Sequence, residues 1–297
     1  EWLERQAHRW KNSYYNTVRI HLEKYLFPTF KNTLIGEITL SQLELFRKRL
    51  AEQTKPDGRK RFTNAHINHI VGPLITILSL AAQEYDFPYP FRCYKNLREE
   101  KPESNPMTLN EVKLFLSVVD PEWHDYYLLR FFTGMRSCEV HGLQIENLDF
   151  RHKLIKIRHN WVNGELTTVK TPKSRRDIPM SEPVFQALQR VVARKTTTDA
   201  FVFTQPDGKP LDTRWVSQYL WYPTLKKANL SRRRPYETRH TAAVLHIAAH
   251  ENPMYVSSML GHSTTKMLFE IYAPYVVNVA RNDGSAFTDM MQQQGIG

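Results

Sequence analysis

The sequence predicts a mainly α-helical protein with one small antiparallel β-sheet. Apolar residues recur at helical spacing through most of the 297 residues, which favours helices. An alternating stretch around Asn163-Gly164 has instead the pattern of a β-hairpin. A polar, charged segment at residues 99–106, interrupted twice by proline, has the composition of a linker. We therefore expect two domains, a helical one at residues 1–98 and a mixed α+β one at residues 107–297.

Composition narrows the classes of partner and compartment. The formal net charge is +11 and the isoelectric point about 9.5, and basic side chains outnumber acidic ones in both parts of the chain. This balance fits a polyanion held by two domains, although many soluble proteins are mildly basic. Cys93 and Cys138 lie in dissimilar surroundings without metal-type spacing, which indicates a reducing compartment. We recognise no apolar run long enough to span a bilayer and no signal peptide, so we expect a soluble intracellular protein without membrane contact.

The first domain is expected to contain three helices with basic edges. Helical spacing runs from Trp2 to about Phe27, where Pro28 is expected to end it. Thr39 and Gln42 form a possible capping box before the second helix, and the third spans about residues 64–85. Candidates for contacts with phosphate, weighed evenly against an ordinary solvated surface, are Arg47, Lys48, Lys55, Arg59, Lys60 and Arg61.

The second domain is expected to begin with a capping box, formed by Thr108 and Glu111. An apolar helical run at residues 126–132 follows and is predicted to end at Gly134. Arg136 then begins the next helix, with Glu139 three residues further on. Because residues at this spacing share a helix face, the carboxylate of Glu139 can hold the Arg136 guanidinium.

Two alternating runs, residues 154–162 and 165–170, are predicted to form the hairpin, and residues 176–179 a third strand. Four basic residues lie at or beyond the end of this hairpin, namely Lys170, Lys173, Arg175 and Arg176. A hairpin of this kind can place a lysine in a DNA groove. An exposed basic turn is also ordinary surface, and for a lone lysine this is the more common case.

Further helices are expected at about residues 182–195, 212–228 and 238–251, and then from Pro253 to a cap at Gly261. The three arginines that precede the third of these are good phosphate partners; they are Arg232, Arg233 and Arg234. The stretch from Pro235 to Tyr275 collects cations, imidazole groups and a phenol. Attack on a DNA phosphodiester needs a nucleophile, cations for the non-bridging oxygens and a proton donor for the leaving oxygen. The groups in this stretch suit that reaction.

Five short motifs, in this order, resemble those of the tyrosine recombinases, also called the phage integrase family. They are T-G-M-R-S-C-E with Arg136 and Glu139, V-K-T-P-K with Lys170, P-Y-E-T-R-H-T with Arg239, L-G-H-S with His262, and I-Y-A with Tyr272. The resemblance covers nearly the whole chain. It implies a helical core-binding domain, a linker, and a mixed α+β catalytic domain with a C-terminal tail.

The resemblance implies a site-specific DNA recombinase, an integrase of a mobile element, in which Tyr272 attacks DNA and leaves a 3′-phosphotyrosyl link. Arg136 and Arg239 would hold the phosphate, Lys170 would protonate the leaving 5′-oxygen, and His262 would donate a hydrogen bond to the phosphate. No metal or cofactor is implied, because the arginines supply the charge. The implied partners are double-stranded DNA with inverted-repeat core sites, a homo-tetramer on that DNA, and accessory DNA-bending or directionality proteins, in the cytoplasm of a bacterium.

One position departs from the family pattern, because Tyr236 stands where the family most often has histidine. A phenol can donate a hydrogen bond to a phosphate oxygen, but with an ordinary pKa of about 10 it is a poor base at neutral pH. His240 is a neighbouring candidate for accepting the proton of Tyr272, or it is a packed helix histidine. Two other functions stay open: a type IB topoisomerase, and a DNA-binding protein with weakened catalysis.

Overall fold

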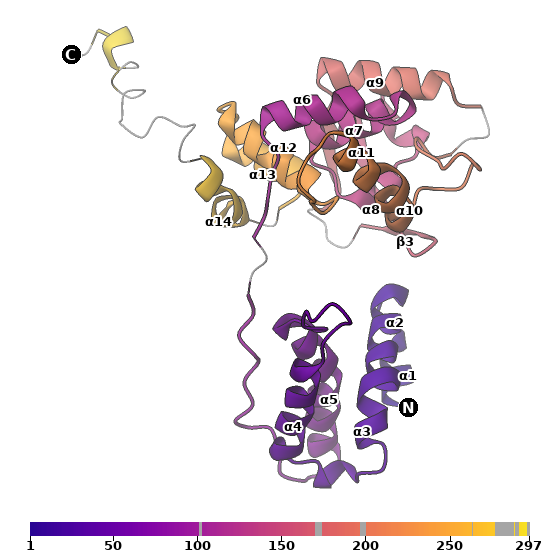
Figure 1. Ribbon diagram of the computed structural model, residues 1–297, viewed down its shortest axis with the longest axis vertical. Coiled ribbons are helices and arrows are strands. Elements are labelled where there is room, and N and C mark those ends of the chain that lie inside the picture. The colour runs from indigo at the N-terminus through magenta and orange to yellow at the C-terminus, as the bar shows by residue number, and fades with distance from the viewer. Residues whose placement is uncertain are drawn as a thin grey trace. The chain divides into compact units, whose positions relative to one another are not determined.

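The computed structural model describes residues 1–100, 103–169, 174–196, 200–262, 264–276, 288 and 291–295. The chain divides into two compact units, unit 1 (Glu1–Glu103) and unit 2 (Ser104–Gly297), and each has its own hydrophobic core (Figure 1). Unit 1 is helical, and unit 2 combines helices with short antiparallel strands. The predicted fold class, mainly α with a small antiparallel sheet, is confirmed.

The helices of unit 1 are α1 (Trp2–Ala7), α2 (Asn12–His21), α3 (Phe27–Phe30), α4 (Leu40–Glu52) and α5 (Asn64–Glu84). The prediction of one helix that Pro28 ends is wrong, because the chain breaks before α2 and then continues through Pro28. A π-helical turn at Leu22–Leu26 joins α2 to α3, and the Phe27 N–H bonds to the Leu22 carbonyl five residues back. Pro28 follows as the second residue of α3, directly after this π-helical turn.

The core of unit 1 forms around α5, whose apolar face is buried. The α5 residues in this core are Ile67, Ile70, Val71, Leu74 and Leu78. By length and composition alone α5 could cross a membrane, contrary to the expectation from the sequence. Its buried face identifies it as the central helix of a packed unit. Helix α4 begins at the predicted capping box, in which the Thr39 hydroxyl accepts from the Gln42 N–H and the Gln42 carboxamide accepts from the Thr39 N–H.

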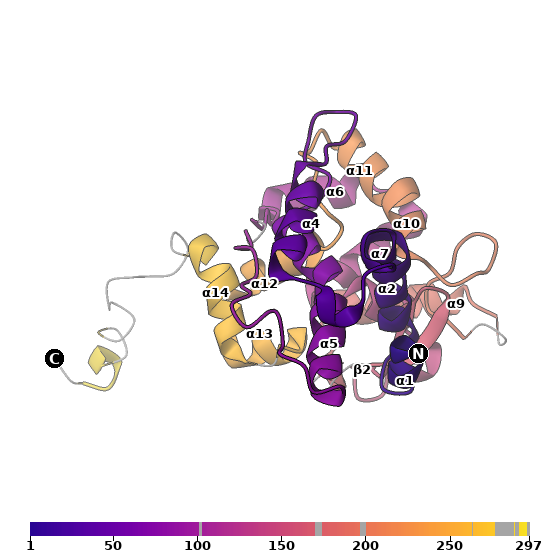
Figure 2. The same cartoon turned by 90° about the horizontal axis from the view of Figure 1, so that it is seen from below.

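The helices of unit 2 are α6 (Leu109–Val118), α7 (Pro121–Thr133), α8 (Ser137–His141), α9 (Glu182–Ala193), α10 (Thr213–Trp215), α11 (Tyr222–Lys227), α12 (Glu237–Ala248), α13 (Pro253–Leu260) and α14 (Thr265–Val276). Helix α6 has the predicted capping box of Thr108 and Glu111. A π-helical turn at Val216–Trp221 joins α10 to α11. Helices α12, α13 and α14 lie side by side in both views (Figures 1 and 2).

The strands form two separate antiparallel sheets. One contains β1 (Leu148–Asp149), β2 (Leu154–Ile157) and β5 (Arg176–Pro179) in the order β1-β2-β5, and the other contains β3 (His159–Val162) and β4 (Glu165–Thr168). The hairpin turn is where the sequence placed it, with positive φ at Asn163 (53°) and Gly164 (83°). The predicted strand 154–162 is interrupted at Arg158, so β5 pairs with β2 while β3 and β4 form the hairpin.

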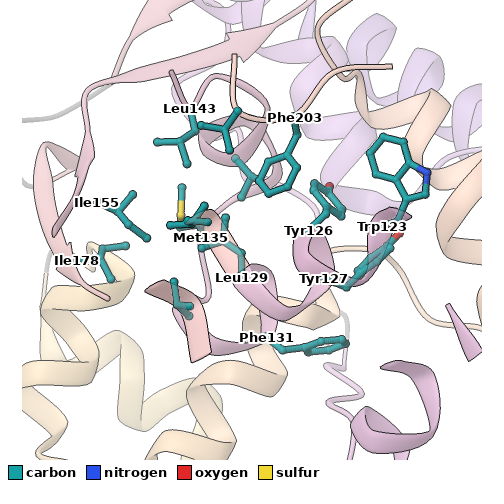
Figure 3. Close-up of a cluster of buried hydrophobic side chains, with 14 of the residues drawn as sticks. Trp123, Tyr126, Tyr127, Leu129, Phe131, Met135, Leu143, Ile155, Ile178 and Phe203 are labelled. Atoms are coloured by element: carbon teal, nitrogen blue, oxygen red, sulfur yellow. The ribbon is translucent and has the colours of Figure 1, made fainter. Parts of the chain in front are cut away.

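Helix α7 supplies much of the core of unit 2 (Figure 3). Its aromatic residues Tyr126 and Tyr127 are fully buried, and Ile155 and Ile178 reach the same core from the facing strands β2 and β5. The helix ends at Gly134 as predicted, and this glycine adopts the left-handed conformation (φ 59°, ψ 20°) typical of a glycine cap. The chain enters the candidate site directly after this cap.

Candidate active site

The candidate site is organised around the C-terminal end of α13, where Gly261 adopts a left-handed conformation (φ 67°, ψ 44°). The last carbonyls of a helix lack partners within the helix and carry partial negative charge. Three successive carbonyls at this end each accept a hydrogen bond from a different arginine. The contacts are Arg176 Nε to Met259 O (2.6 Å), Arg239 Nη2 to Leu260 O (2.7 Å) and Arg136 Nη2 to Gly261 O (3.4 Å). Segments distant in sequence thus place three cations on one turn.

A buried carboxylate, Glu139, joins two of these arginines. Its Oε1 accepts from Arg136 Nη1 (2.8 Å) and Arg176 Nη1 (2.9 Å), and its Oε2 accepts from Arg176 Nη2 (2.9 Å). Burial alone would raise the pKa of Glu139, but the hydrogen bonds and charge of Arg176, together with Arg136, lower it to about 2. The carboxylate is therefore charged at neutral pH and fixes both guanidinium groups. The expected pairing of Arg136 with Glu139 is present in the structure.

The sequence analysis placed Arg176 among the basic residues at the hairpin end, but it did not select Arg176 as a site residue. Its side chain is 6% exposed and forms the ion pair with Glu139 from the start of β5. In β5, Arg176 and Ile178 are the buried positions and alternate with exposed ones. A charged residue at an inward position of an alternating strand was the available signal, because such a charge requires a buried partner.

Arg239 lies on α12 and links the ends of two other helices. Its side chain is 1% exposed, and its Nη1 and Nη2 donate to Gly134 O (2.9 Å) and Leu260 O. Burial lowers the pKa of Arg239 from its ordinary value, but a guanidinium stays protonated at any physiological pH. Arg239 therefore keeps a fixed positive charge between the glycine caps of α7 and α13.

Tyr272 projects from α14 into this cluster and is 1% exposed. Its hydroxyl lies 3.0 Å from Nδ1 of His240 on α12. The ring of His262 stacks on the Tyr272 ring, with centroids 6.4 Å apart and an interplanar angle of 8°. Burial raises the pKa of Tyr272, although the charges of Arg239 and Arg136 oppose this. The phenol is therefore protonated at neutral pH and needs a base before it can attack.

His262 follows Gly261 and is neutral at physiological pH. Burial and the charges of Arg239, Arg136 and Arg176 lower its pKa to about 3. Its Nδ1 is buried and has no hydrogen-bond partner among the described residues.

Tyr236, immediately before α12, is 42% exposed, and its ring lies edge-on to His240 with centroids 5.1 Å apart. The structure thus brings together seven of the eight catalytic candidates, the eighth being Lys170.

Lys170 and Lys173 lie outside the described residues. Arg175 is described and exposed, and it directly precedes Arg176, which is anchored to Glu139 and Met259. Strand β5 thus begins at a residue fixed in the candidate site, a few positions after Lys170 and Lys173 in the sequence.

The other basic candidates fall into two groups. Those with exposed side chains are Lys48, Lys55, Arg59, Lys60, Arg61, Arg232 and Arg234. Arg47 and Arg233 are buried instead, contrary to the expectation that they face phosphate. Arg47 pairs with Glu44 (2.6 Å) and lies over the Tyr94 ring, while Arg233 pairs with Glu111 (2.6 Å). Arg47 therefore connects the segment at Tyr94 to α4, and Arg233 connects the segment before α12 to α6. A buried guanidinium is stable only with such partners.

In unit 2, Tyr272 lies beside three arginines that donate to the turn at the end of α13, and these groups suit attack on a phosphodiester. Residues 106–276, more than half of the chain, match the sequence profile of the Phage integrase family. The chain belongs to the phage integrase family. The prediction of a tyrosine recombinase of this family is thereby confirmed.

Several curated proteins are similar in sequence. Prophage integrase IntR of Escherichia coli (strain K12) is 23% identical over 277 residues, covering 83% of this chain and 67% of IntR. The ICEBs1 integrase of Bacillus subtilis (strain 168) is 22% identical over 302 residues, covering 95% of this chain and 79% of that protein. The transposase from transposon Tn916 of Enterococcus faecalis is 26% identical over 192 residues, and this chain spans 47% of its length.

Two solved structures share the fold. The Tn1549 transposon integrase in complex with a circular intermediate DNA superposes with a TM-score of 0.74 at 23% identity, covering 98% of this chain and 97% of that chain. A lambda integrase tetramer bound to a Holliday junction superposes with a TM-score of 0.69 at 14% identity, covering 91% of this chain and 74% of that chain. These similarities show that the chain shares the fold of these two proteins.

Proposed function

We propose that this chain cleaves and rejoins DNA strands at specific sites, to integrate and excise a mobile element. The observation that carries the proposal is the position of Tyr272. Its hydroxyl is buried in one cluster with Arg136, Arg239 and His262, and the two arginines and the histidine are held by the turn at the end of α13. Attack on a phosphodiester without a metal requires at least a nucleophile and fixed positive charges near the non-bridging oxygens.

The proposed reaction begins with the scissile phosphate bound by Arg136 and Arg239 through its non-bridging oxygens. Neutral His262 adds a hydrogen bond. The oxygen of Tyr272 attacks phosphorus, the bond from phosphorus to the 5′-oxygen breaks, and Lys170 gives that oxygen its proton. The products are a 3′-phosphotyrosyl link and a free 5′-hydroxyl. Because the energy of the broken bond is kept in the new ester, rejoining needs no ATP.

Access to this site requires a local rearrangement. Arg239 and Tyr272 are each 1% exposed, and α14 packs against α12 and α13. A phosphate can contact either residue only when this packing loosens. We infer that DNA binding loosens the packing around Arg239 while the Tyr272 hydroxyl stays beside His240, and that the phosphate stabilises the loosened state by pairing with the arginines.

The proposed partner is double-stranded DNA with inverted-repeat core sites, bound by four copies of the chain. A solved relative is described as a tetramer bound to a Holliday junction, and another as bound to a circular intermediate DNA. The exposed basic residues of unit 1 and the exposed Arg175, Arg232 and Arg234 of unit 2 are the proposed phosphate contacts. Accessory DNA-bending or directionality proteins complete the proposed assembly, which would act in the bacterial cytoplasm.

A trapping experiment tests the proposal without knowledge of the site. The chain is incubated with nicked duplexes whose cores are randomised, because a nick near the cleaved bond lets the short fragment diffuse away and the adduct accumulate. DNA that stays attached in SDS is sequenced. The proposal expects an inverted-repeat consensus with wild type and no adduct with Tyr272→Phe. An adduct that persists in Tyr272→Phe would refute it, and binding without any adduct would favour a DNA-binding role.

A further inference from the structure

The proposed reaction leaves one group unassigned, the base that takes the proton from Tyr272. A phenol at position 236 is a poor proton acceptor at neutral pH. Tyr236 is also turned partly to solvent, with 42% of its surface exposed. Burial raises the pKa of Tyr272, so spontaneous loss of its proton is rarer than for an exposed tyrosine. A neighbouring base is therefore required by the chemistry of the attack.

Two imidazoles lie against Tyr272, and only one is aligned with the hydroxyl. His240 Nδ1 is 3.0 Å from the hydroxyl oxygen, within the range of proton transfer. His262 instead lies parallel to the phenol ring, with centroids 6.4 Å apart. Its pKa of about 3, a consequence of burial and the nearby arginines, also makes it a weak base. The geometry therefore favours His240.

The surroundings of His240 include one acid that can stabilise a transferred proton. Burial lowers the pKa of His240, and the charges of Arg239 and Arg234 lower it further, whereas the charge of Glu237 raises it. The other titratable neighbours are Tyr236 beside it, Tyr272 from α14, and His262 after α13. Glu237 is 2% exposed and is held by the Asn105 N–H (2.9 Å). A fixed carboxylate one helical turn from the imidazole thus opposes the cations.

We propose that His240 is the general base that accepts the Tyr272 proton during strand cleavage. This inference rests on the proposed function. As the bond between the Tyr272 oxygen and phosphorus forms, the proton passes to His240 Nδ1, while Lys170 supplies the proton for the leaving 5′-oxygen. In rejoining, His240 returns its proton to the Tyr272 oxygen as the phosphotyrosyl bond breaks. The role requires the neutral tautomer of His240 with the proton on Nε2 and a lone pair on Nδ1.

The tautomer can be measured without DNA. Nitrogen-15 NMR of histidine-labelled full-length chain distinguishes the two tautomers, and the His240 signals are assigned from their loss in His240→Gln. We expect Nε2 protonated, Nδ1 unprotonated, and a shift of the Nδ1 signal in Tyr272→Phe. A proton on Nδ1 in the neutral ring would make His240 the donor to Tyr272 and would overturn the proposal.

Kinetics on DNA test the same role. Single-turnover adduct formation is measured on the half-site recovered from the randomised library, for wild type, His240→Gln and the control His246→Gln. His246 lies on the same helix, where its imidazole contacts the Phe132 carbonyl (2.8 Å). Loss of a general base typically lowers the rate about 10²- to 10⁴-fold, so we expect a defect of this size in His240→Gln and wild-type rates in His246→Gln.

Two further readouts separate a base from a packing residue. A substrate with sulfur in place of the 5′-bridging oxygen needs no proton donor for its leaving group, so it should not rescue His240→Gln. The variant should also speed up about tenfold per pH unit through the neutral range, while wild type stays nearly constant above the lowered pKa of His240. Wild-type rates in His240→Gln would refute this inference alone. Absence of any wild-type adduct would instead refute the proposed function. In that case the nitrogen-15 NMR measurement of the His240 tautomer would still show whether His240 can accept the Tyr272 proton.

Discussion

Replacing Gly261 with alanine tests whether the turn at the end of α13 is the scaffold of the site. Gly261 has φ of +67°, a conformation that costs an L-residue about 1 kcal/mol. An added Cβ would also lie 3.0 Å from Nη1, 3.2 Å from Cζ and 3.3 Å from Cδ of Arg176. Those distances are shorter than ordinary van der Waals contacts, so one of the two groups must shift.

Arg176 has little freedom to shift. Its guanidinium is hydrogen-bonded to both oxygens of Glu139, to Met259 O and to Ser174 O. Crowding a packed side chain costs about 1–3 kcal/mol, so Gly261→Ala should destabilise unit 2 by about 2–4 kcal/mol in total. The displaced carbonyls would also misplace Arg136 and Arg239. A shift of about 1 Å at a catalytic group can lower a rate about 100-fold.

Gly208→Ala is the matched control, because Gly208 has φ of +82° and nothing within 4 Å of an added Cβ. Urea unfolding of the full chain should show a loss of about 1 kcal/mol for Gly208→Ala and about 1–3 kcal/mol more for Gly261→Ala. Adduct formation should fall at least tenfold in Gly261→Ala only. Equal losses of stability in the two variants, with wild-type cleavage rates, would refute the idea that the arginines hold this turn rigidly.

Three other perturbations test contacts in unit 2. Glu139 has a pKa of about 2 against an ordinary 4.5, so it should contribute roughly 3 kcal/mol to the free energy of unfolding above pH 4.5, and this contribution should be lost as pH falls towards 2. The check is to measure unfolding as a function of acid pH for wild type and Glu139→Gln, and an equal loss of stability in acid for both would contradict it. Arg233→Met should lower thermal stability by breaking the buried pair with Glu111, and it should leave the salt dependence of DNA binding unchanged. Arg232→Met should have little effect on stability, but it should reduce by about one the slope of the logarithm of the DNA-binding constant against the logarithm of the salt concentration. The reverse pattern would show that burial of Arg233 is not structural. Gly142→Ala should destabilise unit 2 by several kcal/mol, roughly, because its Cβ would meet the backbone of Asn160 and Trp161 at 2.7 Å, and a melting temperature equal to wild type would refute that close approach of α8 to β3.

Features with a local cause were predictable from the sequence. The capping boxes at Thr39 and Thr108 depend on residues three positions apart, and both are present. The caps at Gly134 and Gly261 and the turn at Asn163-Gly164 depend on the cost of positive φ for other residues. In these cases the sequence and the structure agree because the interactions that decide the conformation involve only residues a few positions apart.

Features with a distant cause were not predictable in the same way. The pairing of β5 with β2 depends on the interruption at Arg158, which alternation alone does not show. Arg47 and Arg233 read as surface cations, but each has a carboxylate and a packed helix beside it in the fold. Arg176 was missed because its partners, Glu139 and Met259, are 37 and 83 positions away in the chain. A single sequence carries composition and spacing, and it does not show which helix end a side chain reaches.

The central claim is that Tyr272 forms a covalent bond with DNA through a 3′-phosphate. The most direct test is mass spectrometry of the adduct after digestion with nuclease and protease, combined with separate radiolabels on the 5′ and 3′ sides of the nick. The account predicts a single modified peptide in which Tyr272 carries a nucleotide through its 3′-phosphate, and a released strand that begins with a 5′-hydroxyl. A nucleotide on any other residue, or a link through a 5′-phosphate, would contradict it.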